Sequence, residues 1–171
     1  MLQPVVRRTW APIGQTPIHY SWDRHDRLSV IAAITVSPKR NRLGVHFDLY
    51  TENIKTAAVE NFIVSLRRTL GRKLIVIWDG WSVHKAAAKK IRKRFPKTVG
   101  VAFLPPYAPD LNPVEQIWSH TKYADLANFI PRDLKHLALE TWISLTQKHH
   151  NSDLVRSFFN HAKLDINKIF H

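Results

Sequence analysis

Short apolar segments rich in β-branched residues recur along the first two-thirds of the chain, and each is predicted to be a β-strand. The first two, 28–36 and 43–50, are separated by a short polar stretch, so we expect them to be antiparallel neighbours. The third, 73–78, is an unbroken apolar run, which is typical of a strand buried on both faces and central in a sheet. A fourth strand is expected at 99–104.

Between and after these strands, apolar residues recur every three or four positions, which predicts amphipathic helices. We expect Asn53 to cap the first helix and Gly71 to end it, Ser82 to cap the second, and Asn112-Pro113 to begin the third. Two more helices are expected after Pro131. The element order indicates an α/β fold with a mixed sheet flanked by helices, and no linker divides residues 1–171 into more than one domain.

The net charge points to a polyanionic partner. The chain has 26 Lys and Arg against 13 Asp and Glu, which gives a formal charge of +13 and a pI near 10.3. A nucleic acid fits such a balance best, because neutralising phosphates releases counterions and supplies affinity for any base sequence. The alternative is a protein whose surface is merely basic.

Two features bear on the compartment. The chain has no cysteine, so disulfides and thiolate zinc sites do not contribute to its fold. Its longest apolar run, 30–36, is too short to cross a bilayer. We therefore expect a cytoplasmic protein without a membrane partner.

Asp79 directly follows the predicted buried strand 73–78. Ligands and catalytic groups of open α/β sheets gather at the carboxyl ends of the strands, so this position favours a functional carboxylate. The alternative is structural, since Asp79-Gly80 is also a common turn dipeptide.

Glu115 lies in the first turn of the helix that Asn112-Pro113 begins, so the two acids could converge at one end of the sheet. An alternative role is again available. With Asn112 as the cap, Glu115 occupies the third helical position, where an acidic side chain completes a capping box.

Three segments together resemble one family. They are RTWAPIGQTP at 8–17, VIWDGWSVH at 76–84 and LPPYAPDLNPVEQIW at 104–118. The last, long and specific, resembles the signature of the mariner-like DDE transposases, in particular their bacterial insertion-sequence branch. The resemblance covers about 3–126, so we expect a catalytic core at about 3–127 followed by C-terminal helices within 131–171.

This resemblance implies a ribonuclease-H-like fold in which three acids hold divalent metal ions for DNA strand cleavage and strand transfer. Asp79 would be the second acid and Glu115 the third, with Mg²⁺, or Mn²⁺ in its place, as the metal. Double-stranded DNA, both transposon ends and target, would be the partner, and a homodimer the active assembly. The expected location is the bacterial cytoplasm, on the nucleoid when DNA is bound.

The sequence departs from the family pattern at its start. The family's first acid, the strand that carries it beside the strand leading to Asp79, and an upstream helix-turn-helix region would all precede Met1. A wrongly assigned start codon, half of a frameshifted reading frame or a decayed copy would each explain this. We expect weak or no cleavage from the chain as it stands, and the alternative function is that of a non-catalytic DNA-binding remnant; an unrelated RNA-binding domain is a third possibility.

Other residues receive lesser roles. Asp23, Asp26 and Asp48 match no motif position and are expected at the surface or in turns. Gly80 stands where the family commonly has Asn, which removes an orienting hydrogen bond. His84 and Asn112 are candidate supporting residues, although a histidine at a helix start more often makes only local hydrogen bonds.

Basic residues crowd the helix that follows Asp79, and a second basic cluster lies near the start of the chain. We expect these side chains to contact phosphates, although a solvated helical face is the usual role of such a run. The candidate DNA-binding residues are Arg7, Arg8, Lys85, Lys89, Lys90, Arg92 and Lys93.

Overall fold

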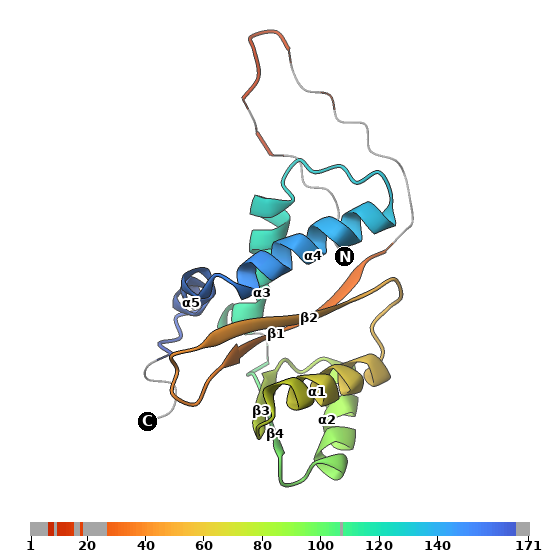
Figure 1. Ribbon diagram of the computed structural model, residues 1–171, viewed down its shortest axis with the longest axis vertical. Helices are drawn as coiled ribbons and strands as arrows, with labels where there is room; N and C mark the ends of the chain where they lie inside the picture. The colour runs from red at the N-terminus through yellow and green to blue at the C-terminus, as the bar shows by residue number, and fades with distance from the viewer. Residues whose placement is uncertain (1–6, 9, 16–17, 19–26, 107, 167–171) are drawn as a thin grey trace.

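The computed structural model describes residues 7, 8, 10–15, 18, 27–106 and 108–166 (Figure 1). The predictions for most of the extended opening segment, and for Asp23 and Asp26, fall outside these residues. Every predicted strand and helix is present. The elements are β1 (Ser29–Val36), β2 (Leu43–Tyr50), α1 (Thr56–Leu70), β3 (Leu74–Trp78), α2 (Ser82–Arg94), β4 (Val99–Phe103), η1 (Pro109–Leu111), α3 (Pro113–His120), η2 (Thr121–Asp125), α4 (Leu134–His149) and α5 (Ser152–His161).

The four strands form two separate pairs. β1 and β2 are antiparallel, as predicted, in a register that runs from Ser29 opposite Tyr50 to Val36 opposite Leu43. β3 and β4 are parallel, with Leu74 beside Val99. Among the described strands, no hydrogen bonds join β1 to β3, so the expected mixed sheet consists of one antiparallel and one parallel pair.

Two hydrophobic cores lie on opposite sides of the β1–β2 hairpin. In Figure 1, α1, α2, β3 and β4 lie on one side of the hairpin, and α3, α4 and α5 lie on the other. Alternate residues of β1 serve the two cores: Ile31 and Ala33 pack against the first, and Val30 and Ile34 against the second. The buried centres are Val59, Phe62, Ile63, Trp78, Ala87, Ala88, Ile91 and Val99 in the first core, and Val45, Ile117, Leu145, Val155, Phe158, Phe159 and Ile166 in the second.

β3 is not buried on both faces, so that prediction was wrong. Leu74, Val76 and Trp78 point into the first core, whereas Ile75 is 70% exposed and Ile77 is 50% exposed. The helices α1 and α2 cover only one face of the β3–β4 pair. No helix in the described part of the chain is long and apolar enough to cross a membrane.

Two of the predicted helix caps are also corrected. α1 begins at Thr56 after an extended Lys55, so Asn53 lies before the cap position and does not cap the helix. Ser82 is the first residue of α2 rather than its cap, and the cap position, Trp81, makes no side-chain capping bond. The other predicted helix ends are confirmed: Gly71 closes α1 in the left-handed conformation, with φ of 61°.

A buried charge pair joins α4 to the π-helical turn η2. The ammonium group of Lys148, only 1% exposed, forms an ion pair with the Asp125 carboxylate and donates a hydrogen bond of 2.9 Å to Ser144 Oγ. Ser144 Oγ donates in turn to Asp125, at 2.6 Å. Burial alone would raise the pKa of Asp125, but the hydrogen bonds from Lys148 and Ser144 outweigh it, and the pKa is lowered.

We predict that Asp125→Ala lowers the free energy of unfolding by about 3–5 kcal/mol, because it leaves the Lys148 ammonium buried without an anion. Urea unfolding followed by circular dichroism measures the loss. A double variant, Asp125→Ala with Lys148→Met, should recover much of it, since no unpaired charge then remains inside. Equal stability of Asp125→Ala and the natural chain would contradict the buried pair.

Candidate active site

Asp79 follows the last residue of β3 and is held by the residues that begin α2. Its Oδ1 atom accepts a hydrogen bond of 2.9 Å from the backbone N–H of Trp81. The same oxygen lies 2.6 Å from Nδ1 of His84. The Asp79 side chain remains 51% exposed. Both of these interactions use Oδ1, so Oδ2 is left for a partner from outside.

Two tryptophans fix the orientation of His84. Its ring stacks on Trp78 with centroids 5.0 Å apart and planes only 3° from parallel, and Trp81 meets it edge-on at 5.1 Å. Trp78 itself is buried in the first core, so His84 is anchored to the body of the domain. Asp79 is thus oriented by His84, which the sequence offered as a supporting residue, and by the Trp81 N–H, which it did not. Both partners lie within five residues of Asp79, in the segment VIWDGWSVH.

Glu115 lies in the first turn of α3 but does not cap it. Asn112 Oδ1 accepts a hydrogen bond of 3.2 Å from the N–H of Val114, so the predicted cap residue is confirmed. The reciprocal half of a capping box is absent here, because the N–H of Asn112 donates to the carbonyl of Pro109 at 2.9 Å. The Glu115 carboxylate is therefore left without a capping role.

The charge of Asp79 acts on Glu115. The pKa of Glu115 is raised, first by burial and then by the negative charge of Asp79. The two predicted acids are therefore coupled electrostatically between the end of β3 and the start of α3. Within the described residues, no group of three or more acidic or histidine side chains is arranged to hold a metal ion. Asp79 and Glu115 together offer hard carboxylate oxygens, which suit Mg²⁺ or Mn²⁺.

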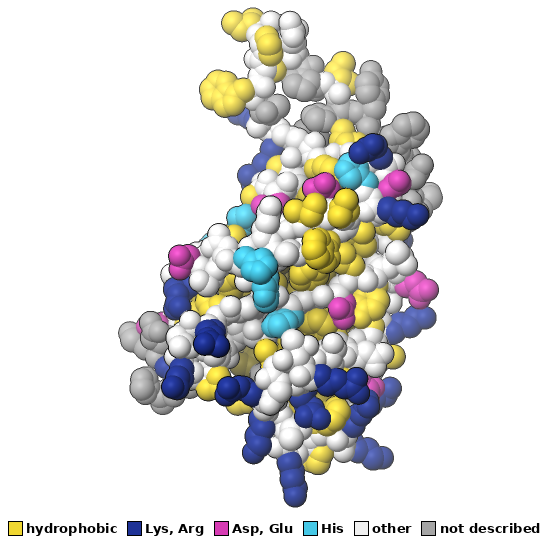
Figure 2. Space-filling model, in the orientation of Figure 1, with side chains coloured by type: hydrophobic (Ala, Val, Ile, Leu, Met, Phe, Trp, Pro, Cys, Tyr) yellow, Lys and Arg dark blue, Asp and Glu magenta, His cyan; other side chains and the backbone are white. Residues whose placement is uncertain are grey.

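Three lysines of α2 form one stripe that begins beside Asp79. The side chain of Lys85 lies over the backbone of Gly80. A Cβ atom added to Gly80 would lie 3.8 Å from the Nζ atom of Lys85. Lys89 and Lys93 follow at successive turns, and both side chains are exposed. Figure 2 shows Lys and Arg side chains gathered at the end of the molecule formed by α1 and α2.

The other candidate DNA-binding residues are differently placed. Lys90 pairs with Glu60 at 3.6 Å, on the side of α2 that faces α1. Arg92 donates to the carbonyl of Val101 at 2.9 Å, on β4. Arg7, in the described part of the opening segment with Arg8, donates its backbone N–H to Asn128 Oδ1 at 2.6 Å, and its guanidinium lies 5.5 Å from the Tyr123 ring centroid, on the segment between α3 and α4. The structure thus does not bring the two predicted basic clusters together.

The fold and the paired carboxylates define the class of protein. Residues 1–138 match the family described as DDE superfamily endonuclease. The chain therefore belongs to that family, whose chemistry implies a divalent metal ion.

Two solved structures share the fold. The Mos1 strand transfer complex matches with a TM-score of 0.53 and 15% identity, over 99% of this chain and 52% of that one. The Mos1 transposase paired-end complex with left transposon end matches with a TM-score of 0.53 and 14% identity, over 95% of this chain and 52% of that one. The fold is ribonuclease-H-like, and the chain spans about half the length of the chains it matches. No curated protein sequence matches significantly.

We predict that Asp79→Asn lowers the pKa of Glu115, because it removes the negative charge that disfavours ionisation of the second carboxyl. Burial remains, so the pKa should stay above its ordinary value. Carbon-13 NMR of the glutamate carboxyls during a pH titration measures the change. Asp110→Asn serves as the matched control and should leave the pKa of Glu115 unchanged. If Glu115 has the same pKa in both variants, Asp79 does not lie close enough to act on it.

Proposed function

We propose that this chain is the catalytic domain of a DNA transposase, which cleaves DNA strands and joins them to a target during transposition of an insertion sequence. The observation that carries the proposal is the pair of carboxylates, Asp79 and Glu115. The charge of Asp79 raises the pKa of Glu115. The capping hydrogen bonds at the start of α3 do not involve the Glu115 carboxylate, so capping does not account for it. Family membership supports the same activity. We propose residues 1–171 as one catalytic domain.

Each residue of the site has a separate task. Asp79 and Glu115 would hold the metal, Mg²⁺ or Mn²⁺, and a metal ion so bound would polarise a phosphodiester and activate the attacking water or 3′-hydroxyl. His84 positions Asp79 by occupying Oδ1, which directs Oδ2 outward. Asn112 caps α3 and so fixes the turn that carries Glu115.

Double-stranded DNA is the proposed substrate. The net charge of +13 and the lysine stripe of Lys85, Lys89 and Lys93 beside Asp79 would hold phosphates next to the acids. The matching structures are of Mos1 transposase with a transposon end and in a strand transfer complex, which supports DNA as the partner here. We propose a homodimer as the active assembly and the bacterial cytoplasm as its location.

One observation favours a second function, that of a non-catalytic remnant that binds transposon ends. The net charge of +13 would support DNA binding on its own, without the acids. Such a remnant would bind DNA equally well without Asp79 and Glu115.

A catalytic domain should show Mg²⁺-dependent nicking of a DNA duplex that carries the transposon end, whereas a remnant should show none. Gel analysis of end-labelled DNA measures the nicking. In a catalytic domain, Asp79→Asn and Glu115→Gln should each abolish it.

The outcome distinguishes the two functions. If nicking persists in Asp79→Asn, Asp79 is not a catalytic residue. Absence of nicking, with DNA binding intact in both acid variants, would favour the remnant.

We further predict that replacing Lys85, Lys89 and Lys93 by alanine lowers the affinity for DNA and makes that affinity less dependent on salt concentration. The slope of log affinity against log salt should fall by about 0.9 for each phosphate that the protein no longer neutralises. Fluorescence anisotropy with a labelled duplex at several salt concentrations measures it. Lys90→Ala with Arg94→Ala is the matched control on the same helix, because both side chains already pair with Glu60. Equal effects per charge removed in the two variants would mean that only total charge matters.

A further inference from the structure

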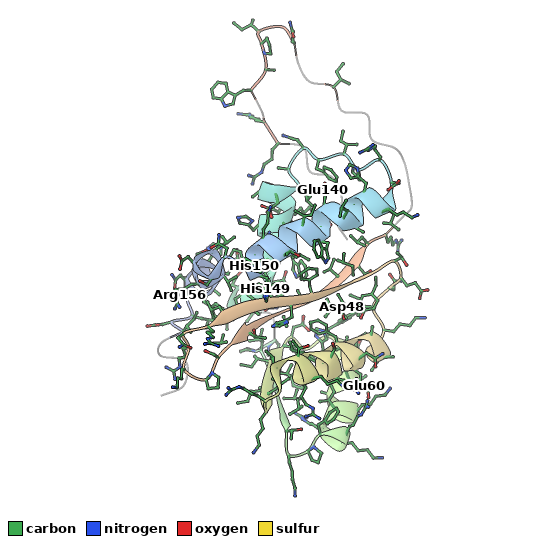
Figure 3. All side chains as sticks on the ribbon, in the orientation of Figure 1. Asp48, Glu60, Glu140, His149, His150 and Arg156 are labelled. Carbon is green, nitrogen blue, oxygen red and sulfur yellow. The ribbon has the colours of Figure 1, made fainter. Side chains whose placement is uncertain are left out.

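A second cluster of ionisable side chains lies where the end of α4 meets β2, and it shares no residue with the acidic site. His46, on β2, and His149, in the last turn of α4, have ring centroids 5.7 Å apart at an angle of 80°. Figure 3 shows His149 and His150 beside β2, and Figure 2 shows histidines gathered in the middle of this face. The two rings line a hollow of about 320 Å³ between α1 and α4.

The hydrogen bonding of His149 fixes which of its nitrogens is available. Its Nδ1 lies 2.7 Å from the carbonyl oxygen of Val45. A carbonyl only accepts, so Nδ1 carries the hydrogen and donates it. In the neutral ring, Nε2 then keeps its lone pair. A bond from the other ring nitrogen to a backbone carbonyl is the usual way in which proteins orient a metal-binding histidine.

Gly44 lies close to both rings. A Cβ atom added there would lie 3.5 Å from His46 Nε2 and 3.8 Å from His149 Cε1, the atom bonded to Nε2. It would also lie 2.9 Å from Thr35 Oγ1, too close without a shift. The absence of a side chain at Gly44 therefore lets the Thr35 hydroxyl and the two imidazoles come close to the same stretch of backbone.

We propose that His46 and His149 bind a divalent transition-metal ion, such as Zn²⁺, through Nε2 of both rings beside Gly44. Metal–nitrogen bonds of about 2.0–2.1 Å place the centroids of two imidazole ligands on one ion about 5–6 Å apart, and the observed separation is 5.7 Å. Within the described residues no third histidine or carboxylate joins the group, so water or the Thr35 hydroxyl completes the coordination.

The chemistry of the pair selects the metal. Imidazole nitrogen favours Zn²⁺, Ni²⁺ and Cu²⁺, whereas Mg²⁺ requires oxygen ligands, so this site and the carboxylates of Asp79 and Glu115 take different ions. Burial, and then the nearby His149, lowers the pKa of His46, which keeps that ring neutral near pH 7. A bound ion would fasten β2 to α4.

The test uses the whole chain with nitrogen-15-labelled histidine, titrated with Zn²⁺ in an excess of Mg²⁺. We expect the Nε2 resonances of His46 and His149 to move together, with Nδ1 of His149 retaining its hydrogen. In calorimetry, His46→Gln and His149→Gln should each lower the Zn²⁺ affinity about tenfold or more, on the order of the loss at metal ligands and their supports. His161→Gln, at an exposed position at the end of α5, is the matched control and should bind normally.

Two further variants separate this site from other causes. Gly44→Ala keeps both histidines but places a Cβ atom against Thr35 and both rings, so it should weaken Zn²⁺ binding as well. Asp79→Asn should leave the His46 and His149 shifts unchanged, which makes the result independent of the proposed transposase chemistry. The proposal is wrong if Zn²⁺ shifts the resonances of other histidines, such as His136 beside Glu140, and leaves those of His46 and His149 unchanged.

Discussion

The β1–β2 hairpin lies between the two hydrophobic cores and packs against both, and the rest of the fold depends on it. One face of β1 packs on the helices α1 and α2 through Ile31 and Ala33, and the other packs toward α3, α4 and α5 through Val30 and Ile34. Each face is apolar, so neither group of helices can leave without exposing the hairpin to water. The hairpin thereby fixes the distance between the two halves of the molecule.

The two acids belong to different halves of the molecule. Asp79 belongs to the first core, because Trp78 anchors β3 and the His84 ring there. Glu115 belongs to the second, because Ile117 is buried in that core and α3 lies against β1. A change in the packing of the hairpin would therefore move one carboxylate relative to the other, even though neither lies on a strand of the hairpin.

The sequence predicted the positions of the strands and helices well, and the burial and long-range contacts of their residues less well. Periodicity and Gly71 placed strands and helices to within a few residues, because these signals are local. The exposure of Ile75 and Ile77 could not be read from an apolar run, which looks the same whether one face or both are covered. The orientation of Asp79 by His84 was within reach, since the two are five residues apart. The approach of His46 to His149 was not, because only the folded chain brings α4 to β2.

The environment of Glu115 argues most directly for a bound cation. A carboxylate in the first turn of a helix is stabilised by the helix dipole and by capping, both of which lower its pKa. Here the N–H of Asn112 is taken by Pro109, and burial together with Asp79 raises the pKa of Glu115 instead. Two like charges held together in this way are unfavourable on their own and become favourable once a divalent ion lies between them. Burial and the charge of Asp79 both disfavour the ionised form of Glu115, and the divalent ion that we propose at this site would offset both effects.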